Sequence, residues 1–309
     1  PPAVARLVLG VRLCAAGARS AVRWAIEAIA VNARSHRLRD HRPRRVRPHH
    51  ALPAQAGDRI GVVSQFAQQR VGVLAGDDAG DKSIIVFDTP KDVQGTVLLP
   101  CYNEQRAIQS VLTEIVSTMR EEPYTYEVLV VDDASTDDTA DVVARIAEQD
   151  PRVRYERLAA NSGGCSAPRN RGLALARADW VMFCDSDDEY EMHACANLLR
   201  AVEEADADIA CGTAERVDVR TGEARRWRPE LHDQHRLADR LTDLTDLLYD
   251  TISVNKIYRR SLLERHGLQF PEGLLFEDQL FTLQAMASAR RIATIPQVVY
   301  RWYVDRLSE

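Results

Sequence analysis

The chain has 309 residues, of which 45% are hydrophobic and 28% charged, the composition of a globular protein with room for one or two domains. Its net charge of −6 is unevenly distributed, because residues 1–50 hold eleven arginines against two acidic residues, a net +9 that leaves −15 for the rest. An acidic body repels a phosphate backbone, so we expect no nucleic acid as partner or substrate.

The first 95 residues differ from the rest and are predicted to form an N-terminal extension. Residues 3–31 are rich in alanine, but interspersed arginines exclude a membrane span and a secretory signal. Residues 32–50 form a basic, proline-containing tract, and residues 83–88 are typical of a strand. Peripheral contact of residues 1–50 with anionic lipid is one interpretation, because a helix followed by basic residues suits such a surface. A solvated arm, or the remnant of a preceding domain, is the other.

The six cysteines show neither a C-x-x-C pair nor the spacing of a zinc site. No histidine lies in a motif that would activate one of them as a nucleophile. Free thiols are expected in a reducing compartment, so the sequence favours a cytoplasmic protein, held at the inner face of the plasma membrane if its basic residues contact lipid.

From residue 96 onward, strands and amphipathic helices are predicted to alternate. Short apolar runs predict four strands, at Thr96–Pro100, Glu127–Val131, Val153–Leu158 and Trp180–Cys184. Apolar residues at three- and four-residue spacing predict the helices between them. Asn103 is expected to cap the first helix, and Ser135 with Asp138 resembles a capping box before the second. This alternation predicts an α/β fold with a Rossmann-like, mostly parallel central sheet flanked by helices.

Polar residues follow each predicted strand, and the carboxyl ends of parallel strands meet at one edge of a sheet. The four segments are Pro100–Glu104, Asp132–Ser135, Asn161–Gly164 and Asp185–Asp188. The last holds three carboxylates, for which a divalent cation such as Mg²⁺ or Mn²⁺ is the usual partner and a solvated acidic turn the alternative.

A nucleoside diphosphate carrying a transferable group fits this set of residues. Gly163 and Gly164 would let the backbone approach it closely, and Arg169 and Arg171 are available to its phosphates. The sequence has no P-loop, and no G-x-G-x-x-G motif follows a strand, which disfavours NAD.

The second half is predicted to bind an acceptor. A strand is expected at Asp208–Thr213, and the charged segment Glu215–Ala238 is expected to be a long loop of the kind that forms binding elements or lids. His232 and His235 within it are interpreted as solvated residues rather than metal ligands.

An amphipathic helix is predicted from Phe276, which is expected on its apolar face. Glu277 and Asp278 fall in its first turn, where a carboxylate suits the helix dipole. Closing strands are predicted over Ile292–Tyr303, and their last three residues, Arg301 to Tyr303, are expected to cover donor phosphates.

Four motifs occur in register: VLLPCYNE, VVDDASTDDT, NSGGCSAPRNRGLALA and FCDSDD. Together they resemble the family 2 glycosyltransferases of the GT-A fold. The resemblance runs from Thr96 to Tyr303 and is more specific than a D-x-D pattern alone. Pro168 stands where the family more often has alanine before Arg-Asn, and the segment is similar to members that build or decorate bacterial cell-surface polymers of the teichoic-acid type.

The resemblance implies a nucleotide-sugar donor, with UDP as the first choice of nucleotide. The donor-binding residues would be Pro100, Tyr102, Glu104, Asp132, Asp133, Asn161, Gly163, Arg169, Asp185 and Ser186. Asp133, with Asp132, would hold the base and ribose, and Arg169 would lie near the diphosphate. Asp187, with Asp185, would bind Mn²⁺ or Mg²⁺. The catalytic residues would be Glu277 and Asp278, with Asp278 as the base.

The sequence therefore predicts a metal-dependent, inverting glycosyltransferase that acts on a glycan, polymer or lipid-linked acceptor. Its catalytic domain would span residues 96–309, with a nucleotide-sugar half at 96–190 and an acceptor half at 191–309. One alternative, a sugar-phosphate nucleotidyltransferase, would need a glycine-rich basic loop after the first strand, which Cys101–Arg106 is not. The other, a catalytically silent nucleotide-sugar-binding domain of a larger polymer-synthesising protein, is disfavoured by the intact acidic motif.

Overall fold

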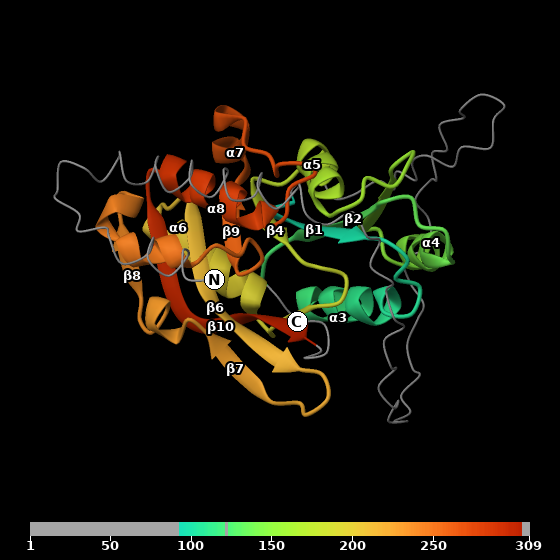
Figure 1. Cartoon of the computed structure of the whole chain (residues 1–309), viewed down its shortest axis with the longest axis horizontal. Helices are drawn as coiled ribbons and strands as arrows, with labels where there is room; N and C mark the ends of the chain where they lie inside the picture. Colours follow the sequence, from blue (N-terminus) through green and yellow to red (C-terminus); the bar gives the residue numbers. More distant parts are fainter. Residues whose placement is uncertain (1–92, 121–122, 305–309) are drawn as a thin grey trace, which may run out of the picture.

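The computed structural model describes residues 93–120 and 123–304, and strands and helices alternate through the first half of this part (Figure 1). The elements are β1 (Gly95–Cys101), α3 (Ile108–Arg120), β2 (Tyr126–Asp132), α4 (Thr139–Gln149), β3 (Val153–Arg157), α5 (Ser166–Leu175) and β4 (Trp180–Phe183). The four predicted strands are present, because each apolar run is buried. The predictions for residues 3–31, 32–50 and 83–88 lie outside the described residues.

The first four strands form a parallel unit in the order β3-β2-β1-β4. The chain moves outward from β1 to β2 and β3, then returns across β1 to form β4 on its other side. A crevice opens at the carboxyl ends of β1 and β4 in such a sheet, because the loops leave the two strands in opposite directions. Helix α5 packs tightly over this unit: a Cβ at Gly172 would lie 2.9 Å from Leu98 Cδ2.

Strands β9, β6 and β10 extend the same sheet beyond β4. The elements of this half are β5 (Glu189–Tyr190), α6 (Ala194–Ala205), β6 (Ile209–Asp218), β7 (Ala224–Trp227), β8 (Arg236–Ala238), β9 (Lys256–Arg259), α7 (Arg260–His266), α8 (Glu277–Ser288) and β10 (Ile292–Val304). Strand β9 is antiparallel to β4 and β6, whereas β6 and β10 are parallel. Most of the paired length is parallel, so the predicted α/β class is confirmed.

Residues 215–238 do not form the long loop predicted for them. Strand β6 continues to Asp218, and a turn through Gly222 (φ +70°) leads into β7, which is antiparallel to β6 and projects at the lower edge of Figure 1. The prediction was wrong because three of the four β7 residues are exposed and two are arginines, so no apolar alternation marks the strand. Residues 292–304 likewise form one continuous strand.

Two predicted helix caps are also wrong. Helix α3 begins at Ile108, and Asn103 (φ +56°) instead accepts the backbone N–H of Thr136 at 2.8 Å. Helix α4 begins at Thr139, and Ser135 donates its N–H and hydroxyl to Asp132 rather than capping a helix. In both places a short polar side chain joins loops that follow strands, an alternative to capping that a local pattern cannot distinguish.

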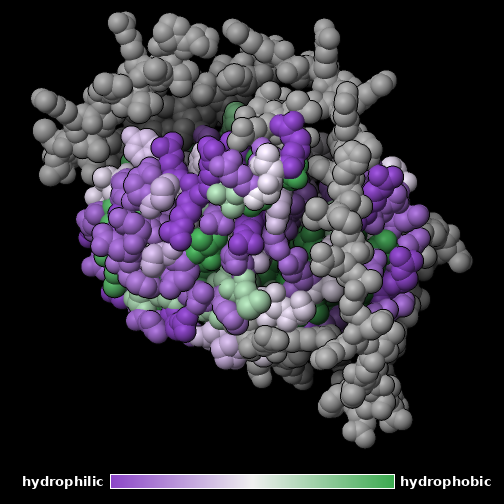
Figure 2. All heavy atoms as spheres, turned by 90° about the horizontal axis from the view of Figure 1, so that it is seen from below, coloured by the Kyte–Doolittle hydropathy of each residue, from purple (hydrophilic) through white to green (hydrophobic). Residues whose placement is uncertain are grey.

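The described surface is largely polar, and Figure 2 shows one face on which hydrophilic side chains predominate. The large apolar side chains exposed in this part of the chain are Tyr102, Met192, Val219, Leu237, Tyr249, Leu275 and Phe276. No helix within residues 93–120 and 123–304 combines the length and apolar character that crossing a bilayer requires. Two of the exposed residues, Leu275 and Phe276, are adjacent and directly precede α8.

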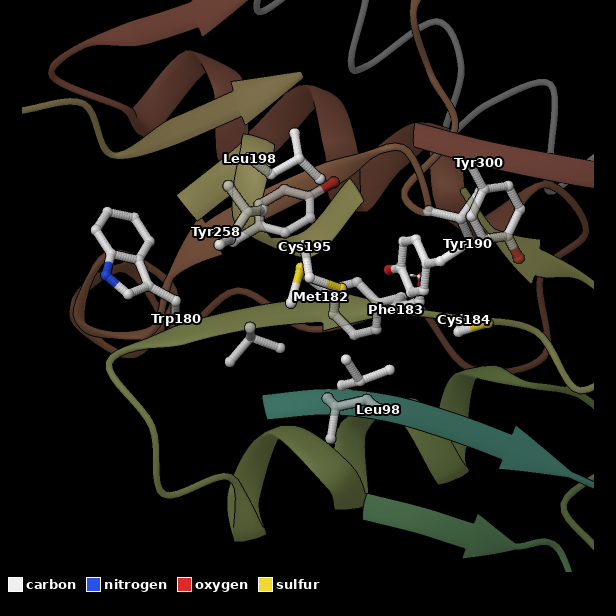
Figure 3. Close-up of a cluster of buried hydrophobic side chains, with 14 of the residues drawn as sticks. Leu98, Trp180, Met182, Phe183, Cys184, Tyr190, Cys195, Leu198, Tyr258 and Tyr300 are labelled. Atoms are coloured by element: carbon white, nitrogen blue, oxygen red, sulfur yellow. Dashed lines mark hydrogen bonds between the residues drawn. The ribbon is translucent and has the colours of Figure 1, made fainter. Parts of the chain in front are cut away.

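An aromatic cluster fastens the second half to the end of β4. Phe183 of β4 packs edge-to-face on Tyr258, Phe270 and Phe281, with ring centroids 5.7, 5.0 and 5.5 Å away. Figure 3 shows Phe183 and Tyr258 within the larger buried core. Each such aromatic pair contributes about 0.5–1.5 kcal/mol beyond area burial. The cluster therefore fixes β9 and α8 against the strand whose next residues begin the acidic motif.

A buried charge supports the opposite end of the parallel strands. Glu127 is fully buried and accepts hydrogen bonds from the Thr96 hydroxyl at 2.8 Å and the Arg154 guanidinium at 3.0 Å. The backbone N–H of Arg177 donates to the same carboxylate at 3.1 Å. This carboxylate therefore connects β1, β2, β3 and the chain leading into β4.

Glu127→Ala is expected to lower the free energy of unfolding by about 3–5 kcal/mol, because it leaves the buried Arg154 without its charge partner. Urea unfolding followed by circular dichroism measures the loss. Arg290→Ala is the control, since its pair with Asp206 is exposed, 66% on each side chain, and should contribute at most about 1 kcal/mol. Equal losses in the two variants would contradict this account.

Candidate active site

The loops that follow β1 and β4 lie together at the carboxyl ends of these strands. Glu104, after β1, accepts a hydrogen bond from Ser186 and lies within the field of Asp187, both after β4. Burial and the charge of Asp187 raise the pKa of Glu104 to about 7. Pro100 is buried in β1, and Tyr102 is exposed beside the crevice. The structure thus brings predicted donor-side residues together from two separate loops.

Tyrosine and backbone groups of β10 hold the acidic segment, Asp185–Asp188. The Tyr300 hydroxyl donates to Asp188 Oδ2 at 2.8 Å and accepts the backbone N–H of Asp185 at 3.1 Å. Asp188 Oδ1 accepts the backbone N–H of Tyr303 at 2.9 Å. Burial, with the charges of Asp185 and Asp187, raises the pKa of Asp188 to about 8. Asp187 is the exposed carboxylate of the segment.

The chemistry of this segment suits a hard divalent cation. No group of three or more His, Cys, Asp and Glu residues in the described part of the chain is arranged to hold a metal by itself. Burial and then the charges of neighbouring carboxylates raise the pKa values of Glu104 and Asp188, and a cation nearby would oppose both causes. Carboxylate oxygens are the donors that Mg²⁺ and Mn²⁺ prefer, and a site with few protein ligands leaves positions for water and phosphate oxygens.

A buried arginine links the acidic segment to the start of α8. Arg169 is 2% exposed, and its guanidinium donates to Asp185 Oδ1 at 2.5 Å and to Asp278 Oδ1 at 2.6 Å. It also lies 3.6 Å from Glu277, with its Cζ over the Phe270 ring at 5.1 Å. A buried guanidinium is stable only with such partners, so Arg169 and these acids depend on one another. Its predicted contact with a diphosphate stays a prediction.

The start of α8 is unusual in its backbone. Phe276 has φ +60°, which is rare for a bulky residue, and its side chain is 63% exposed, so its predicted place on the buried face is wrong. Glu277, the next residue, accepts a hydrogen bond from the Cys165 thiol at 2.7 Å. The first turn of α8 is thus bonded to the residue that precedes α5, while the Phe276 side chain points into solvent.

Asp278 has the features of a proton acceptor. Its hydrogen bonds from Arg169 and from the Ser253 hydroxyl (3.0 Å) both fall on Oδ1, and Oδ2 accepts neither. Burial raises the pKa of Asp278; Arg169 opposes this, and the charges of Asp185 and Glu277 add to it. Its side chain is 26% exposed. A carboxylate whose pKa is raised in this way is a stronger base, because it binds a proton more tightly.

The two aspartates that end β2 are engaged within the protein. Asp132 is fully buried among groups of the following loop and of β3 that donate to it. Asp133 accepts the Asn161 side chain at 3.0 Å and the backbone N–H of Ser162 at 2.9 Å. These bonds fix the loop in which Gly163 has φ +82°. The predicted residues are adjacent, and their roles toward a base and ribose stay predictions.

Two arginines predicted to face phosphates are paired with glutamates. Arg171 lies 2.7 Å from Glu156 of β3, and Arg301 pairs with Glu191 and Glu215. Both arginine side chains remain at least 40% exposed. Arg301, Trp302 and Tyr303 were predicted to cover donor phosphates, and Tyr303 is bonded directly to the acidic segment.

Sequence reasoning missed a buried charge cluster beneath the site. His232 Nε2 and Lys256 Nζ lie 3.0 and 2.8 Å from Asp250 Oδ2. Burial opposes ionisation of Asp250, but Lys256 and His232 outweigh it and lower its pKa to about 2. His232 is 2% exposed, so its predicted solvated position is wrong, whereas His235 is exposed. The signal was Lys256 directly before the apolar pair Ile257 and Tyr258, since a lysine buried in a strand needs a buried acid.

Comparison with known proteins gives the class of this site. Residues 96–267 match the model of glycosyl transferase family 2, and the chain belongs to that family. The predicted family is therefore confirmed.

Two relatives of similar sequence are both named as transferases of poly(ribitol-phosphate). The poly(ribitol-phosphate) beta-N-acetylglucosaminyltransferase TarS of Staphylococcus aureus is 31% identical over 218 residues, which cover 69% of this chain and 36% of TarS. The poly(ribitol-phosphate) beta-glucosyltransferase of Bacillus spizizenii is 29% identical over 217 residues, covering 69% of this chain and 33% of that protein. The chain thus spans about a third of the length of these relatives.

Solved structures agree on the fold. The crystal structure of S. aureus TarS in complex with UDP-GlcNAc matches with a TM-score of 0.60 and 27% identity, over 69% of this chain and 59% of that one. The GT-A architecture predicted from the motifs is therefore confirmed for the described residues.

Asn170 anchors the segment that leads to α8, since its side chain donates to Phe270 O and accepts the Phe270 N–H, both at 2.8 Å. Asn170→Ala is expected to lower the free energy of unfolding by about 2 kcal/mol, roughly 1 kcal/mol for each bond. It should also speed amide exchange in residues 268–276, as read by mass spectrometry. Asn197→Ala, which removes a surface contact with Arg200, is the control. Unchanged protection of residues 268–276 in Asn170→Ala would rule out the anchoring role.

Proposed function

We propose that this chain is a metal-dependent, inverting glycosyltransferase that moves a sugar from a UDP-sugar to a hydroxyl group of a cell-surface polymer, another glycan or a lipid-linked acceptor. Membership of glycosyl transferase family 2 supports the sugar transfer. The TarS structure with UDP-GlcNAc supports UDP as the nucleotide, and the names of two relatives support a polymer of polyol phosphate as one acceptor.

The observation that carries the proposal is the bridge that Arg169 makes between Asp185 and Asp278. It sets a carboxylate with raised pKa beside the acidic segment at the crevice where α/β sheets bind ligands. A transferase needs this pairing, because the group that takes the proton must lie next to the group that holds the leaving phosphates. A solvated acidic turn would not require a buried arginine.

Asp187, with Asp185 beside it, would hold Mn²⁺ or Mg²⁺, and such an ion when bound supplies positive charge to the leaving diphosphate. The exposure of Asp187 supports this role, since its carboxylate lies where a donor would enter. Asp188 and Glu104 would add negative charge beside a bound ion, and their raised pKa values fit a place that a cation would stabilise.

In the proposed reaction, an acceptor hydroxyl gives its proton to Asp278 Oδ2 as its oxygen bonds to the anomeric carbon. The bond from that carbon to the diphosphate breaks, and its electron pair leaves with the diphosphate oxygen. One displacement from the face opposite the leaving group inverts the configuration. Arg169 and Ser253 position Asp278 by holding Oδ1, and Glu277 shares the charge of Arg169.

We assign donor binding to residues 96–190 and acceptor binding to residues 191–309. The clustering of Glu104, Asp133 and Asp187 at the ends of parallel strands supports the first assignment. A cytoplasmic location is proposed because the five described cysteines are free thiols. Contact of residues 1–50 with the inner face of the plasma membrane concerns residues outside the described part of the chain and is proposed on sequence alone.

Titration calorimetry with UDP, GDP, CDP and dTDP, each with and without Mn²⁺, tests the donor site. We expect UDP to bind in the presence of Mn²⁺ and Asp187→Ala to weaken that binding by at least about tenfold, because a metal ligand is lost. Asp141→Ala removes an exposed carboxylate from α4 and should bind as the wild type does. Absence of binding by all four nucleotides to a folded protein would overturn the donor site and favour a silent domain.

Asp278→Asn tests the base. The variant is expected to bind UDP with unchanged affinity while kcat falls about 10²-fold or more, the scale of a lost general base. Transfer is measured by release of UDP in the presence of acceptor, with Asp141→Asn as the matched control. Retained turnover in Asp278→Asn would remove Asp278 from the mechanism.

The pH profile of kcat is an independent test of Asp278 as the general base. A base acts when ionised, so activity falls as pH drops through its pKa. Burial raises the pKa of Asp278 above its ordinary value of 3.8, so the acid limb should lie above that value. The residual activity of Asp278→Asn should lack this limb, and a limb at the same pH in both proteins would assign it to another group.

A further inference from the structure

Five side chains form a strip on the β6–β7 hairpin and its neighbours, which we call the arginine–aromatic strip: Arg216, Trp227, Arg228, Tyr249 and Trp302. Trp227 and Trp302 pack edge-to-face with ring centroids 5.2 Å apart. Arg216 lies over Trp302 at 5.6 Å. Arg228 lies over both Trp227 and Tyr249, at 5.6 and 5.8 Å. The five side chains thus contact one another in an unbroken row, and the proposed catalytic steps use none of them.

The strip is accessible to a ligand. Arg228 and Tyr249 are exposed, and the other three side chains are half-buried. The indole N–H of Trp227 is itself buried and has no hydrogen-bond partner within the described residues, so a ligand would meet the exposed part of the ring rather than this group. Figure 2 views the molecule from the side on which β7 projects, and hydrophilic side chains cover most of that face. Rings already held in place by arginines lose little conformational entropy when a ligand packs on them.

Two members of the strip are close in sequence to residues of the proposed site. Trp302, within the row, is followed in β10 by Tyr303, whose backbone N–H is bonded to the acidic segment. Tyr249, at one end of the row, is followed four residues later by Ser253, whose hydroxyl donates to Asp278. The chain therefore connects the strip to the proposed site through β10 and through residues 249–253.

The β6–β7 hairpin carries a cluster of arginines on an otherwise acidic protein. Residues beyond the first 50 carry a net charge of −15, yet β7 and the residue after it present Arg225, Arg226 and Arg228. Glu223 offsets Arg225 at 2.9 Å, and Glu230 lies 3.9 Å from Arg228. The exposed Arg228–Glu230 pair is too long to contribute much stability. Arg228 can therefore leave Glu230 and bind an anionic group of a ligand at a shorter distance.

We propose that the arginine–aromatic strip binds the acceptor, and that this acceptor is a polymer with anionic repeats of the polyol phosphate class. This inference rests on the proposed function in one respect only, namely that the bound polymer is the acceptor of the transferred sugar. The ring faces take the apolar C–H side of the polyol carbons, and the guanidinium groups pair with phosphates. A neutral glycan would fill the rings but offer Arg228 no anion closer than Glu230, so it fits less well.

The test measures binding of an oligomer of glycerol phosphate to the whole chain by calorimetry, without donor or metal. Arg228→Ala is expected to raise Kd about tenfold, the effect of losing one charge-assisted hydrogen bond, and Trp227→Ala should also weaken binding. Wild-type binding should weaken with salt, because phosphate pairing is screened. Arg145→Ala, which removes an exposed arginine from α4, is the matched control and should leave Kd unchanged. Arg228→Gln replaces Arg228→Ala if the latter unfolds.

Three results would overturn the proposal: no binding of the oligomer, equal binding by wild type and the Arg228 variant, or binding of a neutral dextran oligomer as tight as that of the phosphate oligomer. Titration with UDP separates this proposal from the proposed function, since strip variants should bind UDP as the wild type does. If the wild type binds no nucleotide but still binds the oligomer through Arg228, sugar transfer fails as the function and the anion-binding strip stands.

Discussion

The site depends on one buried guanidinium. Arg169 donates to Asp185, two residues after the strand β4 ends, and to Asp278, in the first turn of the helix α8. Without this positive charge, three carboxylates from distant parts of the chain would face one another in a poorly solvated place, and their mutual repulsion would push the two elements apart. The position of the proposed base is therefore tied to that of the acidic segment. Arg169 holds both the group proposed to accept the proton and the segment proposed to hold the leaving diphosphate.

The ionisable groups around this support fall into two kinds. Burial and neighbouring acids raise the pKa values of Glu104 and Asp188 to about 7 and 8, so these groups are under-compensated as the protein stands. Asp250, by contrast, has a pKa lowered to about 2 by Lys256 and His232. A carboxylate that already has a buried lysine and a hydrogen-bond partner belongs to the scaffold, whereas buried carboxylates beside other acids mark the place where an external cation is most stabilising.

The parallel strands and the gathering of polar residues at their ends could be predicted, because an apolar run and the rule for carboxyl ends need no knowledge of distant partners. The failures have a common physical cause. Asn103 and Ser135 have the chemistry of caps, but the loops after β1 and β2 bond to each other through these two residues, and His232 is buried because Asp250 and Lys256 are present. Strand β7 forms by pairing with β6 although its own residues are mostly exposed. Partners remote in sequence decide each of these cases, and a single local pattern does not contain them.

The two halves of the sheet are joined along a narrow seam. Strand β9 pairs with β4 through three residue pairs only, Trp180 with Arg259, Val181 with Tyr258 and Met182 with Ile257. The β6–β7 hairpin lies beyond this seam and pairs with neither β1 nor β4, so insertions in the hairpin would leave the register of β1 to β4 untouched. A protein built in this way can exchange the surface proposed to face a polymer, by recombination or loop growth, while inheriting the proposed nucleotide site unaltered. One donor chemistry can then diversify over many cell surfaces.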